Sequence, residues 1–254
     1  MIASQFVSRV ALNRDKVDSF ERYPFNLAAI RSLESLELHP KMTIFVGENG
    51  SGKSTLLEAI AVSLGFNPEG GSKSFAFGTR ASHSVLHECL RVAKGFRRPK
   101  DGFFLRAESF FNVATEIERL DEEPLGGPPV IDAYGGRSLH EQSHGESFLA
   151  LLMNRFRGDS IYLLDEPEAA LSPQRQLAAL SRIHDLIEAN AQFVIATHSP
   201  ILMAYPEARI YQFGPDGIAQ VAYEDTEHYQ VTRNFLVNPA RMLRVLFDRT
   251  AEED

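Results

Sequence analysis

The chain contains three short hydrophobic runs, at residues 42–46, 160–164 and 192–196. Continuous apolar runs of this length are typical of strands that are buried on both faces of a sheet. A helical pattern begins after Ser172-Pro173, because a polar cap followed by proline favours a helix start. The apolar positions of this helix are Leu177, Leu180, Ile183 and Ile187. Strands that alternate with amphipathic helices predict an α/β fold, with a mostly parallel core sheet flanked by helices.

The last part of the chain predicts a β-hairpin followed by a helix. Residues 209–213 and 218–223 are strand-forming and flank Gly-Pro-Asp-Gly, which is a strong turn signal. A final helix is expected at 238–248. Near the beginning, the spacing of Leu33, Leu36 and Leu38 predicts an edge strand before the run at 42–46.

Residues 66–159 separate the first two apolar strands and predict an inserted helical lobe. The segment is rich in turn signals, and short helices are expected at 84–92, 112–120 and 146–156. On this interpretation residues 1–254 form one domain, in which 1–65 and 160–254 make up the core.

Composition narrows the class of protein. Of the 254 residues, 44% are hydrophobic and 24% are charged, which is typical of a globular chain that can bury a full core. The single cysteine, Cys89, excludes an internal disulfide and suits a reducing cytoplasm. We expect a cytoplasmic protein without a membrane span, because neither a secretory signal nor a run of about eighteen apolar residues is recognisable.

The charge is unevenly distributed. A formal net charge of −8 argues against a protein that coats nucleic acid with its whole surface. The segment Arg91–Lys100 is nevertheless basic and contains no acid. Two interpretations stay open: a solvated loop, which is the more common, or a docking surface for nucleic acid or an acidic protein partner.

Residues 47–55, Gly-Glu-Asn-Gly-Ser-Gly-Lys-Ser-Thr, fit the phosphate-loop pattern G-x-x-x-x-G-K-[ST] between a strand and a helix-forming run. Glycines let backbone N–H groups turn toward phosphate oxygens, and the helix N-terminus adds the positive end of its dipole. Lys53 is expected to reach the β- and γ-phosphates of a nucleotide, and the Ser54 hydroxyl to bind Mg²⁺. The candidate nucleotide-binding residues are Gly47, Glu48, Asn49, Gly50, Ser51, Gly52, Lys53, Ser54 and Thr55.

Polar residues follow the other two apolar strands directly. Asp165 is expected to help hold Mg²⁺, mostly through water, because the carboxyl ends of parallel strands meet at one edge of the sheet. Glu166 can orient and polarise the attacking water, which makes it the candidate catalytic base beside Lys53. His198 follows the strand at 192–196 and is the candidate to hydrogen-bond the γ-phosphate or the attacking water.

The order of these motifs resembles that of the ATP-binding-cassette (ABC) ATPases. Residues 169–172, Ala-Ala-Leu-Ser, fit the family pattern after Asp165-Glu166-Pro, and 142–147, Gln-Ser-His-Gly-Glu-Ser, are similar to its signature motif, usually quoted as LSGGQ. In that family the signature binds the nucleotide held by the other subunit. The resemblance therefore implies an ATP-dependent homodimer in which Ser143, Gly145 and Glu146 bind ATP across the interface, through a hydroxyl and N–H groups at a helix start.

Some details favour soluble relatives, such as chromosome-maintenance, recombination-repair and phage-defence ATPases, over transporter subunits. Glu146 replaces the usual signature glutamine, and His198-Ser-Pro is similar to the soluble type. The family also places a Mg²⁺-contacting glutamine between the phosphate loop and the signature, where Glu108 is the candidate substitute. Tyr23 and Phe25 are candidates for an adenine contact, although either could belong to the core.

The sequence thus predicts a stand-alone P-loop ATPase of ABC type that dimerises around ATP and Mg²⁺. In it, 1–65 and 160–254 form the nucleotide-binding core, and 66–159 carry the signature. Two other hypotheses stay open: an ATP-operated binding switch with slow turnover, and a nucleic-acid-processing ATPase that uses Arg91–Lys100. A transporter subunit is the least favoured, and the partner that ATP binding would drive is not identified by the sequence.

Overall fold

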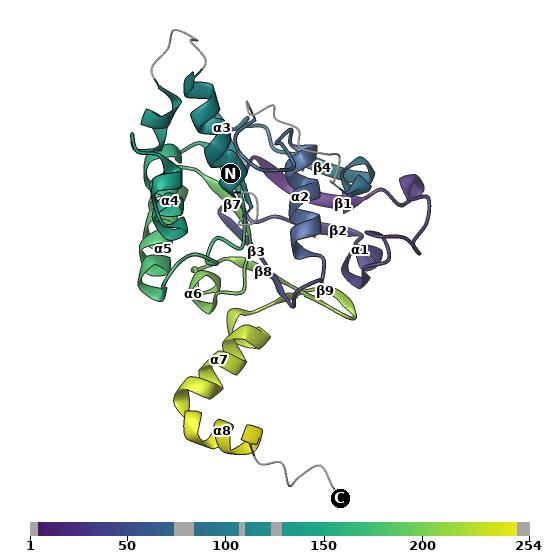
Figure 1. The fold of residues 1–254 in the computed structure, drawn as a ribbon. Coiled ribbons are helices and arrows are strands. Elements are labelled where there is room, and N and C mark those ends of the chain that lie inside the picture. Colours follow the sequence, from purple (N-terminus) through teal and green to yellow (C-terminus); the bar gives the residue numbers. More distant parts are fainter. Residues whose placement is uncertain (1–4, 74–83, 107–109, 123–128, 248–254) are drawn as a thin grey trace, which may run out of the picture.

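A six-stranded sheet forms the centre of the molecule (Figure 1). The computed structural model describes residues 5–73, 84–106, 110–122 and 129–247. The strand order is β5-β6-β7-β3-β8-β9, in which the first five strands run parallel and β9 is antiparallel to β8. The strands are β3 (Met42–Gly47), β5 (Asp101–Arg106), β6 (Ser160–Asp165), β7 (Gln192–Ala196), β8 (Arg209–Gly214) and β9 (Gly217–Val221). The three apolar runs and the hairpin predicted from sequence are confirmed.

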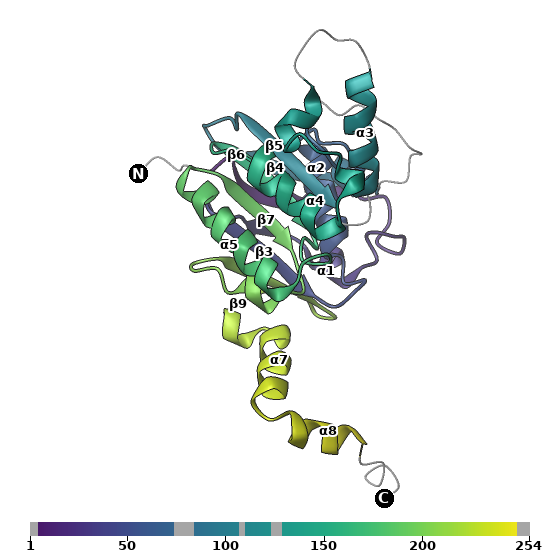
Figure 2. The same ribbon diagram turned by 60° about the vertical axis from the view of Figure 1, so that its left-hand side comes forward.

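Both faces of this sheet are covered, which explains why its strands are apolar throughout. Successive side chains of β6 alternate between two cores: Tyr162 and Leu164 pack on one face, and Ile161 and Leu163 on the other. The first face is covered by α3 (Phe110–Glu122), α4 (His144–Ala150), a π-helical turn at Leu151–Arg155 and α5 (Pro173–Glu188). The second is covered by α1 (Ala28–Ser32) and α2 (Lys53–Ser63), as Figure 2 shows from the side.

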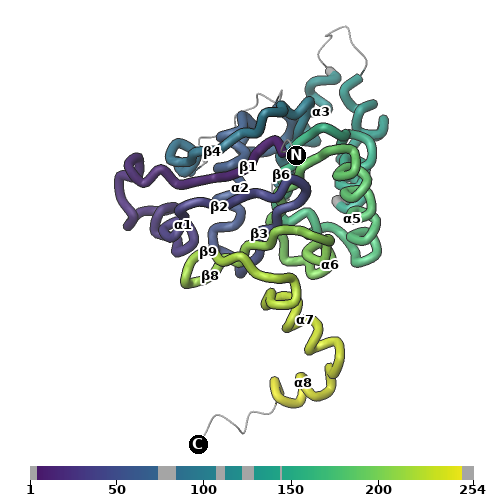
Figure 3. Tube along the Cα trace, turned by 180° about the vertical axis from the view of Figure 1, so that it is seen from behind, coloured from purple at the N-terminus to yellow at the C-terminus, as the bar shows by residue number. Residues whose placement is uncertain are grey.

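A second, three-stranded antiparallel sheet packs over the α2 side of the molecule (Figure 3). Its order is β2-β1-β4, and its strands are β1 (Val7–Leu12), β2 (Ser35–Glu37) and β4 (Leu90–Lys94). One buried side chain joins it to the central sheet. The Gln192 amide accepts hydrogen bonds from the backbone N–H groups of Phe6 and Val7 at 3.0 Å each, and donates to the Val7 carbonyl at 2.8 Å and the His39 carbonyl at 3.0 Å.

Two expectations about residues 66–159 need correction. The helix predicted at 84–92 is present only in part, as a short 3-10 helix at Val85–Cys89. The residues from Leu90 on form β4 instead, because pairing with β1 gives them sheet hydrogen bonds that outweigh their helical spacing. The expected lobe also supplies β5, which pairs with β6 in the central sheet, so the core is not confined to 1–65 and 160–254. The helices expected at 112–120 and 146–156 are confirmed as α3 and as α4 with its π-helical turn.

Within the described residues, three further α-helices follow β7. The four-residue α6 (Pro200–Met203) packs against α5, whereas α7 (Glu227–Val237) and α8 (Pro239–Phe247) extend away from the body in Figures 1 and 2. The sequence predicted α8 but not α7. None of the helices in the described part of the chain is both long and apolar enough to cross a membrane.

The Gln192 amide should contribute strongly to stability. Replacing it with leucine leaves buried backbone groups of the small sheet without partners, so we expect the free energy of unfolding to fall by about 2–5 kcal/mol. Equilibrium urea unfolding measures the change. The exposed Gln220 in β9 supplies the control, since Gln220→Leu should change the value by less than about 0.5 kcal/mol. Equal losses in the two variants would show that Gln192 does not join the sheets.

Candidate nucleotide-binding site

The loop at 47–52 has the backbone conformation that its glycines permit. Gly47, Gly50 and Gly52 have φ values of 144°, 79° and 101°, which side chains rarely allow. A Cβ atom at Gly47 would also lie 2.4 Å from the carbonyl oxygen of Phe213. The loop therefore turns tightly between β3 and α2, and its backbone N–H groups lie at the N-terminus of α2, where anions are favoured.

Lys53 begins α2 and turns back over the loop. Its ammonium group donates to the carbonyl oxygens of Gly47 at 2.8 Å and Glu48 at 2.9 Å, and only 3% of the residue is exposed. Burial lowers the pKa of Lys53, and the nearby carboxylates of Glu166 and Asp165 oppose that shift. An ammonium group has three N–H donors, so one stays available for a phosphate oxygen.

Ser54 and Asp165 meet at the floor of the site. The Ser54 hydroxyl donates to Oδ1 of Asp165 at 2.8 Å, across 111 residues of sequence. In addition, the Ser51 hydroxyl is buried in the loop without a hydrogen-bond partner among the described residues. A hydroxyl beside a carboxylate is the hard oxygen pair that Mg²⁺ prefers, and an unpaired hydroxyl in the loop suits a phosphate oxygen. These residues therefore fit both Mg²⁺ and a phosphate group.

Glu166 and His198 face each other above this floor. Glu166 takes a left-handed φ of 49°, and its backbone N–H donates to the Ala196 carbonyl at 2.9 Å, which fixes it beside the end of β7. Its Oε1 lies 3.4 Å from Nε2 of His198. The Glu166 side chain is about 40% exposed, so the carboxylate is open to solvent. The structure thus brings together Lys53, Ser54, Asp165, Glu166 and His198 from three neighbouring strand ends.

His228 is a member of this site that the sequence analysis missed. Its Nε2 lies 2.9 Å from Nδ1 of His198, so one ring donates a hydrogen bond to the other. Burial lowers the pKa of both histidines, and the positive charge of Lys53 lowers them further, which favours neutral rings. His228 lies in α7, which the sequence did not predict, and a single histidine 30 residues after His198 gives no pattern that would assign it.

Glu168 was also missed by the sequence analysis, and its carboxylate binds the backbone of His198. Its Oε1 accepts the backbone N–H of His198 at 2.5 Å. Burial raises the pKa of this carboxyl group, and Oε2 has no partner among the described residues. Glu168 therefore positions the loop that carries His198. Its position two residues after Glu166 gave no reason to distinguish it from an acidic residue exposed to solvent.

The signature residues lie at the start of α4, away from the loop at 47–52. Ser143 caps this helix: its hydroxyl accepts the Glu146 N–H at 3.4 Å, and the Glu146 carboxylate accepts the Ser143 N–H at 3.0 Å and hydroxyl at 2.8 Å. A Cβ atom on Gly145 would lie 2.4 Å from the Ala170 carbonyl oxygen. No hydrogen bond described here joins these residues to the phosphate loop.

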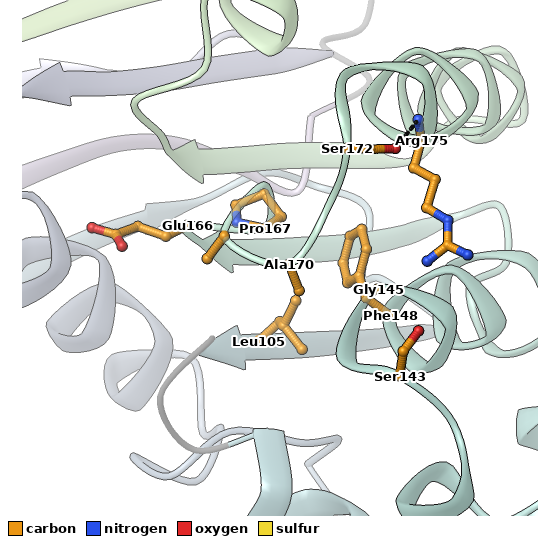
Figure 4. A pocket seen from close by; sticks show the side chains of 10 residues that line it. Leu105, Ser143, Gly145, Phe148, Glu166, Pro167, Ala170, Ser172 and Arg175 are labelled. Atoms are coloured by element: carbon orange, nitrogen blue, oxygen red, sulfur yellow. Dashed lines mark hydrogen bonds between the residues drawn. The ribbon is translucent and has the colours of Figure 1, made fainter.

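A cavity of about 620 Å³ separates the signature from Glu166 (Figure 4). Glu166 and Ser143 lie at opposite ends of this cavity, with Phe148 and Leu105 between them. Arg175 lines it at the same end as Ser143. Within one chain, the cavity therefore lies between Ser143 and Glu166, while Gly145 packs against Ala170.

The candidate Mg²⁺ ligand Glu108 and the two candidate adenine contacts, Tyr23 and Phe25, have different outcomes. Glu108 lies outside the described residues; the preceding strand β5 ends at Arg106, in register with Asp165. Phe25 is buried in the core. Tyr23 is 64% exposed and its hydroxyl lies 3.1 Å from the Thr55 hydroxyl, so of the two candidates it is the one that contacts the loop and stays accessible.

Comparison with known proteins assigns the family. Two models named as AAA domains match this chain, one at residues 25–103 and one, described as a putative AbiEii toxin of a type IV toxin–antitoxin system, at 130–204. The cytochrome c biogenesis ATP-binding export protein CcmA of Rhodopseudomonas palustris is 30% identical over 65% of this chain and 82% of its own length. The chain belongs to the ABC-type P-loop ATPases.

Other relatives of this ABC-type ATPase agree with the assignment. The hemin import ATP-binding protein HmuV of Pseudomonas aeruginosa is 31% identical, over 66% of this chain and 71% of that protein. ABC transporter G family member 22 of Arabidopsis thaliana is 26% identical, and the match spans only 22% of that longer protein. The fold is similar to that of MJ1267, an ATP-binding cassette of an ABC transporter, with a TM-score of 0.50 at 17% identity, over 95% of this chain and 99% of that one.

The half-buried pair of His198 and His228 should make stability depend on pH. Since the folded-state pKa values of both rings lie below the ordinary histidine value of about 6.5, the unfolded chain binds more protons than the folded chain as the pH falls through that value, and stability decreases. We expect His228→Asn to reduce the loss of unfolding free energy between about pH 7 and about pH 5. Urea unfolding at each pH measures it, with Gln230→Asn on the same helix as the non-titrating control. Parallel pH profiles for the wild type and His228→Asn would contradict the assignment.

Proposed function

We propose that this ABC-type ATPase binds Mg–ATP at 47–55 and hydrolyses it with Glu166 as the base that polarises water. The carrying observation is the 2.8 Å contact of Ser54 with Asp165, with Lys53 and Glu166 beside it. Ser54 and Asp165 would hold Mg²⁺, with Glu108 as a further candidate ligand. When bound, Mg²⁺ neutralises phosphate charge.

The remaining residues have distinct roles in this proposal. Lys53 contacts the β- and γ-phosphates, for which its carbonyl-bound ammonium group is already positioned. Neutral His198 can donate a hydrogen bond to the γ-phosphate from Nε2, if Nδ1 accepts from His228. The ring then stabilises the phosphate without a charge change of its own. Glu166, whose Oε1 lies 3.4 Å from Nε2 of His198, accepts a proton from the attacking water.

A homodimer completes the site in this proposal. Ser143 and Gly145 line the cavity at the end opposite Glu166 in their own chain, and neither they nor Glu146 have a described hydrogen bond to the phosphate loop. A second copy, turned about a two-fold axis, could place its signature against the nucleotide of the first. Both sites would then form together, because a two-fold interface uses the same surface on each chain.

Glu166→Gln tests both the base and the dimer. The variant keeps the size of the side chain but cannot accept a proton, so we expect hydrolysis to fall by about 10²–10⁴-fold while ATP binding remains. Small-angle X-ray scattering should then detect a compact, closed dimer that forms only with ATP. The exposed Glu34 gives the control, since Glu34→Gln should hydrolyse ATP at the wild-type rate. Normal turnover in Glu166→Gln would refute the role of this residue, and negligible turnover in the wild type would favour an ATP-operated switch.

A basic groove favours nucleic-acid processing as a second candidate function. A cavity of about 630 Å³ is lined by Lys73, Lys94, Arg97 and Arg98, with an apolar floor that includes Phe6. Phe96 stands at its rim and is 94% exposed. Cations beside an exposed aromatic ring suit a single strand, whose phosphates pair with the cations while a base stacks on the ring.

Salt dependence tests this second function. We expect the wild type to bind a labelled single-stranded oligonucleotide, with an affinity that falls as salt rises. Arg98→Gln should lower the salt slope by about one phosphate contact, and Phe96→Ala should weaken binding at every salt concentration. Arg22→Gln, an exposed arginine outside the groove, is the control and should bind as the wild type does. Absence of binding at low salt would exclude the function.

A further inference from the structure

The helices α7 and α8 form an arm with an uncovered apolar surface. No residue of either helix is buried, and the pair projects from the body in Figures 1 to 3. Large hydrophobic side chains are exposed along the arm, namely Val231, Phe235, Leu236, Val237, Leu243, Val245, Leu246 and Phe247. Soluble monomers rarely expose so many apolar side chains together, so this surface indicates an interaction site.

The apolar residues of α8 are concentrated on one side. At 100° per residue, Leu243, Leu246 and Phe247 lie together, and Arg241 and Arg244 lie on the opposite side with Val245. Leu246 and Val245 lie on different sides of α8 but are similarly exposed, at 66% and 72%. The face formed by Leu243, Leu246 and Phe247, hereafter the apolar face of α8, therefore carries no charge of its own.

The base of the arm is fixed to the nucleotide site. Thr226 is fully buried and caps α7, accepting the Tyr229 N–H at 3.3 Å. The Tyr223 hydroxyl donates to the Pro200 carbonyl at 3.0 Å, and His228 contacts His198 at 2.9 Å. The arm thus starts beside the phosphate loop and extends from that part of the molecule, where the second copy would dock.

The size and chemistry of the surface suit a copy of itself. With each large apolar side chain offering about 150–200 Å² when fully exposed, the exposed fractions of these side chains without Val245 amount to roughly 700 Å² per chain, which lies within the range that one partner buries in a stable interface. A two-fold contact between two uncharged faces buries apolar surface against apolar surface. It also leaves Arg241 and Arg244 in solvent, so their like charges need not meet.

We propose that the arm of a second copy covers this surface, and that the two arms hold a pair of chains together without nucleotide. The contact between the two arms does not depend on the proposed function; only its effect on ATP hydrolysis rests on that function. Tethered chains meet at an effective concentration that can reach the millimolar range, so closure around ATP becomes an intramolecular step. Hydrolysis per chain then stays constant when the protein is diluted.

The contact itself is tested without nucleotide. Light scattering of the full chain at micromolar concentration should give the mass of two chains for the wild type and of one chain for Leu246→Asp. Val245→Asp is the matched control, with the same new charge on the same helix at equal or greater exposure but on the arginine side, and it should remain a dimer. Circular dichroism and ATP binding establish that each variant is folded. A monomeric wild type overturns the proposal, as does an equal effect of the two variants.

The consequence is tested by dilution. Specific ATPase activity should be constant for the wild type and Val245→Asp, and should fall about tenfold per tenfold dilution for Leu246→Asp, by mass action. If Glu166→Gln fails to close on ATP while the nucleotide-free wild type is an arm-dependent dimer, the proposed function fails and the arm contact survives. If closure succeeds but Leu246→Asp remains dimeric without nucleotide, only the arm contact fails. Binding of a monomeric wild type to anionic vesicles would identify a membrane as the occupant instead.

Discussion

The pairing of β7 with both β3 and β6 determines where every candidate catalytic group lies. Ala196 is in register with Phe45 on one side and with Asp165 on the other. Two backbone hydrogen bonds continue this alignment, from Thr197 N–H to the Phe45 carbonyl at 3.1 Å and from Glu166 N–H to the Ala196 carbonyl at 2.9 Å. A slip of one residue would turn the side chains of β7 to the opposite face and separate His198 from Glu166.

Much of this arrangement was predictable because it depends on short sequence patterns. Continuous apolar runs identified the three central strands, since burial on both faces removes the usual alternation. The polar residues after those strands identified Asp165, Glu166 and His198, because parallel strands deliver their carboxyl ends to one edge. The glycines at 47, 50 and 52 and the following lysine were sufficient to assign the phosphate loop, and in the structure these three glycines have positive φ values.

The features that were missed depend on tertiary contacts. The strand β4 is only half buried and has an irregular pattern, so its pairing with β1 left no periodic signal. His228 reaches the site only because α7 packs at its edge, and Glu168 differs from a surface acid only in its burial. The resemblance implied that Ser143, Gly145 and Glu146 act on the nucleotide of another chain, and their role as the signature stays a prediction. The relatives reported above include ATP-binding components of transporters. Family membership alone therefore does not identify the partner of this ATPase.

The close approach of Gly145 to Ala170 has a mechanical consequence. The helix that carries Ser143 and the segment after Glu166 touch with no room for even one additional carbon atom. Close-packed contacts transmit displacement because they have no free volume in which to absorb it. A movement of Ala170 toward Gly145 would therefore displace the start of α4 as well, which couples the segment after Glu166 mechanically to the helix that carries Ser143.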